Sequence, residues 1–264
     1  MKAVGIIASA AFIIALPLLL VTTSVRVAAS EVRLYEYSLR EYDAGETTGV
    51  ELAELDRASR EIIHYFENDA EELRIVVDRG GEEVSLFNER ETLHMVDVKD
   101  LFTIVYRVNE IALAVVLGTI GARYLWAREV SIRRLAKESL AGVGLGIAAV
   151  GGLAAFAAVG FSEFWTRFHE IAFPNDLWQL NPATDRLIQM FPVPFWEDAT
   201  FLVAGATLAQ AFAVVVLASG YLFFTRRARD SQEAVSSEPV PVSVSPGHTH
   251  PPEGEIPPPP DEAR

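Results

Sequence analysis

Two segments of the sequence contain a histidine among side chains that can move protons. The first is 87–99, where Glu91, His94 and Asp97 would lie on one stripe of a helix. A carboxylate beside an imidazole fixes its tautomer and raises its basicity. This pattern suits general acid–base chemistry, although a surface stripe of ion pairs has the same spacing.

The second segment, 163–198, holds His169 and mixes aromatic residues and prolines with polar side chains. Three of the four tryptophans lie here, as in a belt at a membrane interface. Polar side chains within an apolar interfacial loop need partners, so they indicate a site. A belt alone does not explain the polar residues of this segment, which include Asn175, Asp176, Asp185, Arg186 and Gln189.

The other three histidines are weaker candidates. His64 follows Ile63 on an amphipathic segment, and a helix-surface or core histidine is the simpler interpretation. His248 and His250 fall in a tail from Asp230 that is rich in serine, proline and glutamate, which predicts disorder. We expect no site in that tail.

The composition excludes several classes of function. The 264 residues include no cysteine, so disulfides, thiolate metal sites and a cysteine nucleophile are absent. The formal charge of −14 argues against a nucleic-acid partner, because phosphate binding needs a basic face. No Gly-x-Ser-x-Gly elbow is present for a serine hydrolase. No cofactor is predicted, since neither His-x-x-x-His nor His-x-Glu marks a metal site.

Four apolar runs predict an α-helical integral membrane protein. A bilayer core of ~30 Å needs about 20 apolar helical residues. The run 103–126 carries Arg107, Glu110 and Arg123, so its ends must reach the interface, where arginine can snorkel. The predicted spans are 1–25, 103–126, 139–162 and 199–225.

The first run also resembles a cleaved signal peptide. Lys2 precedes an apolar core, and Ala28 and Ala29 are small. Its uncharged stretch exceeds the usual ~7–15 residues, and Arg26 would lie four residues before the cut. We therefore expect a retained span.

Lysine and arginine near the spans set the predicted orientation. They concentrate in the loop 127–138 and directly after the fourth span, at the start of 226–264. The positive-inside rule places both segments, and both termini, in the cytoplasm. The segments 26–102 and 163–198 then lie outside, with nine basic against 20 acidic residues in the first.

The outer segment 26–102 is expected to be a small α+β cap of helix, hairpin and helix. Thr48 and Glu51 form a capping-box pattern before the first helix. Two β-prone runs, 75–78 and 82–87, flank a Gly-Gly turn. Asn88 and Glu91 form a second capping box, on a helix that leads into the second span.

At the two histidines the sequence resembles a family of four-span bacterial membrane proteins, the lipoprotein intramolecular transacylases. The motifs are Phe-Asn-Glu-Arg-Glu-x-x-His-Met-x-Asp-Val-Lys at 87–99 and Phe-His-x-x-x-Phe-Pro-Asn-Asp-x-Trp-x-Leu-Asn-Pro-x-Thr-Asp-Arg-Leu-Ile at 168–188. The resemblance implies transfer of the sn-2 acyl chain of a diacylglyceryl lipoprotein to its own N-terminal cysteine amine, which gives a lyso-form lipoprotein. It places the two catalytic histidines at His94 and His169. Supporting residues are then expected at Glu91, Asp97, Lys99, Asn175, Asp176, Trp178, Asp185 and Arg186.

The expected partners are a membrane lipoprotein and the phospholipid bilayer. Direct intramolecular transfer needs a proton acceptor for the amine and a proton donor for the glycerol oxygen, and imidazoles suit both roles. Two alternatives remain open from the residues alone. One is a non-catalytic membrane protein whose acidic outer segment binds a partner; the other is a metalloenzyme that uses both histidines and nearby carboxylates.

Overall fold

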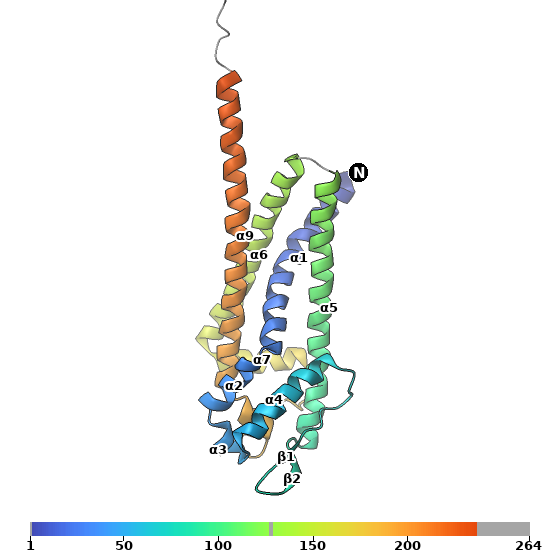
Figure 1. Cartoon of the computed structure of the whole chain (residues 1–264), viewed down its shortest axis with the longest axis vertical. Coiled ribbons are helices and arrows are strands. Elements are labelled where there is room, and N and C mark those ends of the chain that lie inside the picture. Colours follow the sequence, from blue (N-terminus) through green and yellow to red (C-terminus); the bar gives the residue numbers. More distant parts are fainter. Residues whose placement is uncertain (1, 127–128, 237–264) are drawn as a thin grey trace, which may run out of the picture. The chain divides into compact units, whose positions relative to one another are not determined.

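The computed structural model describes residues 2–126 and 129–236. The chain divides into one compact unit at 1–224, which holds the cap and both histidines, and a second at 225–264. Figure 1 shows the helices and strands. The helices are α1 (Lys2–Ser30), α2 (Val32–Glu41), α3 (Ala44–Thr48), α4 (Leu52–Glu67), α5 (Glu89–Trp126), α6 (Glu129–Val159), α7 (Phe161–Ala172), α8 (Arg186–Met190) and α9 (Val193–Ser236). The strands are β1 (Val76–Asp78) and β2 (Glu83–Ser85).

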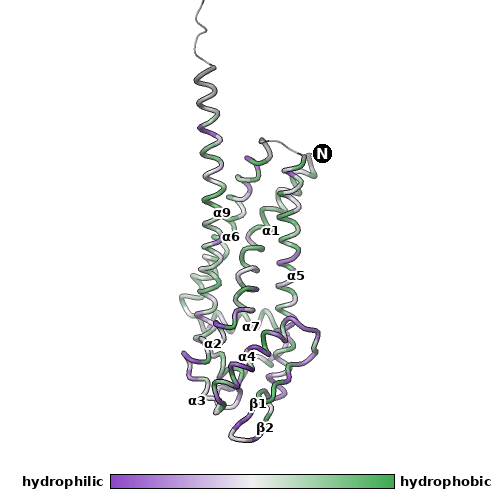
Figure 2. Tube along the Cα trace, in the orientation of Figure 1, coloured by the Kyte–Doolittle hydropathy of each residue, from purple (hydrophilic) through white to green (hydrophobic). Residues whose placement is uncertain are grey.

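Four of the described helices are long and apolar enough to cross a membrane, which confirms the predicted class. They are Val4–Ser30, Glu89–Leu125, Ile132–Val159 and Val193–Ala228. These helices are rich in hydrophobic residues along their length (Figure 2). They expose large apolar side chains such as Ile7, Leu117 and Leu217, as helices in lipid do. The 38 residues of α5 would extend about 57 Å, well beyond a ~30 Å bilayer core. The charged residues at 89–100 therefore place this first part of α5, including His94, outside the apolar span.

Small residues and polar cross-links join the long helices. A Cβ at Gly142 would lie 2.9 Å from the Ile13 carbonyl oxygen, so glycine allows α6 to approach α1 this closely. Asn109 on α5 donates to Thr22 on α1 at 3.0 Å. Thr207 on α9 donates to Ser24 on α1 at 2.9 Å, so α1 contacts each of the other three long helices.

The cap consists of α2, α3, α4 and the antiparallel hairpin β1–β2, in which Val77 pairs with Val84. The helix–hairpin–helix prediction is confirmed, and two short helices, α2 and α3, precede it. The Thr48 capping box is wrong: Thr48 ends α3, Gly49 caps it with φ of 67°, and Glu51 is the N-cap of α4. The Thr48 hydroxyl accepts instead from the Val50 amide at 3.2 Å, within the turn between the helices.

The core of the cap includes residues of the segment between α7 and α9. Leu39, Leu55 and Ile62 of the cap are buried in one cluster with Met190 and Phe191. The Ser38 hydroxyl donates to the Met190 carbonyl oxygen at 2.7 Å. The segment 173–192 is therefore built into the cap rather than lying free at the membrane.

Helix α9 continues to Ser236, so the tail predicted to be disordered from Asp230 is helical over 230–236. The remainder of that tail, with His248 and His250, lies outside the described residues.

Candidate active site

His94 is placed by the start of α5, which forms as the Asn88–Glu91 capping box predicts. The Asn88 amide donates to Glu91 Oε2 at 2.9 Å, and the Glu91 amide donates to Asn88 Oδ1 at 3.0 Å. The Leu187 amide also donates to Glu91 Oε1, at 2.6 Å, so this buried carboxylate joins α5 to α8. The helix turn that carries His94 is thereby fixed against α8.

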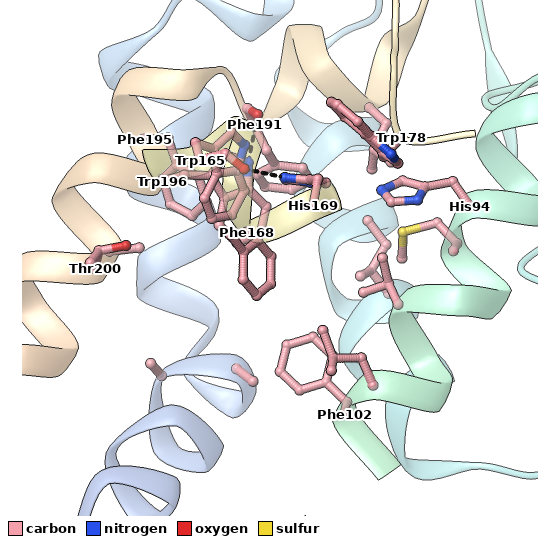
Figure 3. Close-up of a pocket in the computed structure, with 18 of the residues that line it drawn as sticks. His94, Phe102, Trp165, Phe168, His169, Trp178, Phe191, Phe195, Trp196 and Thr200 are labelled. Atoms are coloured by element: carbon pink, nitrogen blue, oxygen red, sulfur yellow. Dashed lines mark hydrogen bonds between the residues drawn. The ribbon is translucent and has the colours of Figure 1, made fainter. Parts of the chain in front are cut away.

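His169 is held on α7, a short amphipathic helix. Its Nδ1 lies 2.7 Å from the Trp165 carbonyl oxygen. Because a carbonyl oxygen only accepts, Nδ1 carries the proton and the lone pair of the neutral ring is on Nε2. Trp165 stacks on Trp196 of α9, with ring centroids 4.9 Å apart, so His169 is attached to an aromatic wall (Figure 3).

The two imidazoles point toward each other from α5 and α7 (Figure 3). Their ring centroids are 6.2 Å apart, and only 6% of His94 and 7% of His169 is exposed. Phe173 contacts both rings, at 5.2 Å from His94 and 5.5 Å from His169. Trp178 lies 5.0 Å from His169. The pair therefore occupies a confined, aromatic environment.

An apolar cavity of about 450 Å³ has both histidines in its lining. Aromatic rings of α7, of Phe191 and of the start of α9 form one wall, and Phe102 of α5 lies on the other (Figure 3). Met95 of α5 also lines the cavity. The lining also includes Val25 and Ala28 at the end of α1, and Val203 of α9. The cavity thus joins the histidines to the ends of three long apolar helices.

Burial keeps both imidazoles neutral. Burial, helped by the neighbouring charge of His169, lowers the pKa of His94 to about 4, and Asp97 opposes this shift. Burial also lowers the pKa of His169, against the hydrogen bond to Trp165. Near neutral pH each ring can therefore accept a proton at one nitrogen and donate one at the other.

The carboxylate partner expected for His94 is not hydrogen-bonded to it. Glu91 caps α5, and Asp97 Oδ2 accepts from Asn175 Nδ2 at 2.9 Å. The buried His94 Nδ1 has no hydrogen-bond partner among the described residues. A buried polar atom without a hydrogen bond lowers the stability of the folded protein. Such atoms are rare, and they occur at functional sites.

Four of the expected supporting residues either line the cavity or form contacts between α5 and the loop after α7. Trp178 lies in the cavity lining, while Asp97 and Asn175 form the hydrogen bond just described. Asp176 follows in the same loop and contacts Arg90 of α5. The role of Arg90 was not predictable from the sequence, because its position one turn before His94 gives no chemical signal by itself.

Asp185 and Arg186 form hydrogen bonds within the segment around the start of α8 and with Asn88, which precedes α5. Asp185 is buried and accepts from the Asn88 side chain at 3.0 Å and the Asn181 amide at 2.7 Å. Arg186 donates to the Thr184 carbonyl oxygen at 2.8 Å.

Lys99 contacts the segment after α4 and is not part of the cavity lining. It donates to the Ala70 carbonyl oxygen at 2.7 Å and covers the Tyr65 ring. Lys99 therefore fastens the segment after α4 to α5.

His64 is exposed on α4, as expected for a surface histidine.

The aromatic wall was predicted only as a membrane belt. Phe168, Phe191, Phe195 and Trp196 all line the cavity, although their sequence pattern suits a belt equally well. Within 2–126 and 129–236, no group of three or more His, Asp or Glu side chains is placed to hold a metal ion.

Fold and site together define a multi-pass helical membrane protein with a histidine pair at the head of an apolar cavity. A family model described as "Lipoprotein intramolecular transacylase Lit" matches residues 10–196. The chain belongs to this family of membrane transacylases, which confirms the resemblance of its two histidine motifs.

Solved structures agree on the fold. The membrane-integral lipoprotein intramolecular transacylase Lit from Bacillus cereus has a TM-score of 0.70 and 17% identity, covering 87% of this chain and 99% of that one. A variant of that protein with one histidine replaced by arginine has a TM-score of 0.66 and 16% identity, covering 86% and 96% of the two chains. A variant with the histidine replaced by alanine has a TM-score of 0.66 and 17% identity, covering 86% and 97%. Comparison with curated proteins gives no significant match.

Proposed function

We propose that this protein moves the sn-2 acyl chain of a diacylglyceryl lipoprotein to the α-amino group of its N-terminal cysteine. The observation that carries the proposal is the pair of buried, neutral imidazoles, 6.2 Å apart, at the head of an apolar cavity. A cavity of this kind suits an acyl chain, and the imidazoles suit the proton transfers of aminolysis. Donor and acceptor belong to one molecule, so the protein supplies position and proton transfer.

The proton transfers balance without water or a cofactor. The amine nitrogen attacks the ester carbonyl carbon, and His169 Nε2 accepts the proton that the nitrogen loses. As the bond from that carbon to the glycerol oxygen breaks, His94 gives the oxygen a proton from one ring nitrogen and accepts the proton carried by His169 at the other. Neither ring becomes an anion, and both end in the neutral form. The assignment of the base to His169 follows from its tautomer, since Trp165 leaves Nε2 as the acceptor.

The cap and the site are proposed to face the outside of the cell. At the other end of the bundle, Arg123 pairs with Glu138 at 2.6 Å, and Arg134 pairs with the same carboxylate at 2.9 Å. Other basic residues lie early in α6 and directly after the fourth span. The positive-inside rule places both groups on the cytoplasmic side. This orientation places the cavity toward the outer leaflet, within reach of the lipid of an exported lipoprotein.

Expression with a reporter lipoprotein, in a bacterium that leaves lipoproteins diacylated, tests the function. Substrate and product have the same mass, so the N-terminal peptide is treated with mild base before mass spectrometry. An amide-linked chain survives this treatment, whereas both ester-linked chains of the substrate are lost. Retention of one chain on the cysteine amine supports the proposal; complete loss of both chains, with the protein present in the membrane, contradicts it.

The His94→Ala, His169→Ala double variant is the matched control. Amide formation that persists at the native level in this variant would refute the histidine site. A separate measurement of reporter level excludes an effect on lipoprotein supply.

A further inference from the structure

The loop 173–178, between α7 and α8, is attached to α5 on both sides of His94. On one side, Arg90 Nη2 donates to the Asp176 carbonyl oxygen and lies 3.6 Å from Asp176 Oδ1. On the other, Asn175 Nδ2 donates to Asp97 Oδ2 at 2.9 Å. Arg90 and Asp97 stand four residues before and three residues after His94, so all three share one helix face.

Asn175, which is hydrogen-bonded to Asp97, also holds Trp178 by hydrogen bonds within the loop. Its Oδ1 accepts from the Leu177 amide at 3.1 Å, and its carbonyl oxygen accepts from Trp178 Nε1 at 3.0 Å. The Trp178 ring in turn lies 5.0 Å from the His169 ring. A continuous series of contacts therefore runs from α5 through the loop to His169. It connects the two histidines in addition to the direct contact between their rings.

We infer that Arg90 and Asp97 are positioning residues, which hold the loop 173–178 so that Phe173 and Trp178 fix the relative placement of the two imidazoles. The inference rests on the proposed function for its activity readout. Neither residue takes part in the cap that starts α5, which Asn88 and Glu91 form. A loop is intrinsically more mobile than the helices beside it, and a displacement of ~1 Å at a reacting centre can cost about 10²-fold in rate.

Exchange of the two hydrogen-bonding side chains tests the Asp97–Asn175 pair with little change in volume. Asn175→Asp brings two carboxylates together, and we expect lyso-lipoprotein formation to fall by about 10- to 100-fold. The double variant Asn175→Asp, Asp97→Asn reverses donor and acceptor and keeps the backbone contacts of residue 175. It should recover to within about threefold of the native rate, as coupling between contacting residues predicts.

Hydrogen exchange supplies a readout that is independent of acyl transfer. The amides of Leu177, Gln179 and Leu180 are hydrogen-bonded within the loop or its continuation. They should exchange faster in Asn175→Asp and return to native protection in the double variant, while α5 stays protected. Asp100→Asn, which removes an exposed carboxylate from the same helix, is the control and should change neither readout.

The outcomes separate this inference from the proposed function. A double variant as impaired and as fast-exchanging as Asn175→Asp would overturn the inference, and so would native activity and protection in Asn175→Asp. If native protein forms no lyso-lipoprotein, the proposed function fails, and the exchange measurement alone decides whether the pair holds the loop. Should Asn175→Asp not accumulate in the membrane, Asp97→Ala takes its place, with faster loop exchange expected and native exchange overturning the inference.

Discussion

The rings of His94 and His169 lie 6.2 Å apart although the residues belong to different helices and are separated by 75 positions in the sequence. Three features produce this approach: the capping box that starts α5, the amphipathic α7, and the loop that packs Phe173 against both rings. The juxtaposition gives the chain two neutral proton carriers at one end of an apolar cavity.

Removal of either histidine should abolish detectable acyl transfer. General acid–base groups contribute about 10²–10⁴-fold, so His94→Ala and His169→Ala should each reduce lyso-lipoprotein formation by at least this range. His64→Ala, on the exposed face of α4, serves as the matched control and should keep native activity. Base-stable acylation of the reporter measures the effect. Native activity in either single variant, at equal membrane level, would exclude that histidine from the reaction.

The secondary structure near the site was predictable because its signals are local. The Asn88–Glu91 capping box formed as predicted, since both partners lie within one turn. The Thr48 box failed because Gly49 adopts a left-handed conformation and ends α3 there, a choice that residue spacing does not reveal. The hairpin followed from its Gly-Gly turn, where both glycines have positive φ.

The partners of the polar residues in the second motif could not be predicted. Asn175 pairs with Asp97, and Asp185 with Asn88, across more than 75 positions, so only the folded chain identifies the bonds. The expected carboxylate–imidazole contact fails for the same reason, because Asp97 finds the amide of Asn175 instead. Aromatic residues were equally ambiguous: a membrane belt and a cavity wall need the same side chains.

Stability should fall as the pH decreases through the ordinary histidine range. Both imidazoles have a lowered pKa in the folded protein, about 4 for His94 against 6.5 in the unfolded chain. Below 6.5 the unfolded chain therefore binds more protons than the folded protein, and the free energy of unfolding decreases. Thermal unfolding in detergent between about pH 7 and pH 5 measures this, since one pKa unit corresponds to ~1.4 kcal/mol.

The variant His94→Asn provides the comparison for this pH dependence. It removes the more strongly shifted group, so the melting temperature should decline less steeply with decreasing pH than in the native protein. Equal slopes for the two proteins would show that His94 is not buried in the neutral form.

The orientation of the cap can be measured directly because the chain contains no cysteine. Ser85→Cys, in β2 of the hairpin, should react with a membrane-impermeant maleimide added to intact cells. Lys137→Cys, on α6 near the opposite end of the bundle, should react only after the cells are opened. Reversed accessibility of the two cysteines would place the histidines on the cytoplasmic side and remove the basis for action on exported lipoproteins.

Filling the cavity should block acyl transfer without unfolding the protein. Val203 on α9 lines the cavity, and Val203→Phe places a ring where the proposed acyl chain lies. We expect a decrease of about 10-fold or more, because a chain that cannot enter leaves its ester away from the imidazoles. Val216→Phe, on an outward face of the same helix that is 52% exposed, adds the same ring outside the cavity and should keep native activity. Base-stable acylation and membrane level are measured for both variants. Equal activity of the two would mean that the acyl chain reaches the histidines by another path, whereas equal loss would point to a general disturbance of α9.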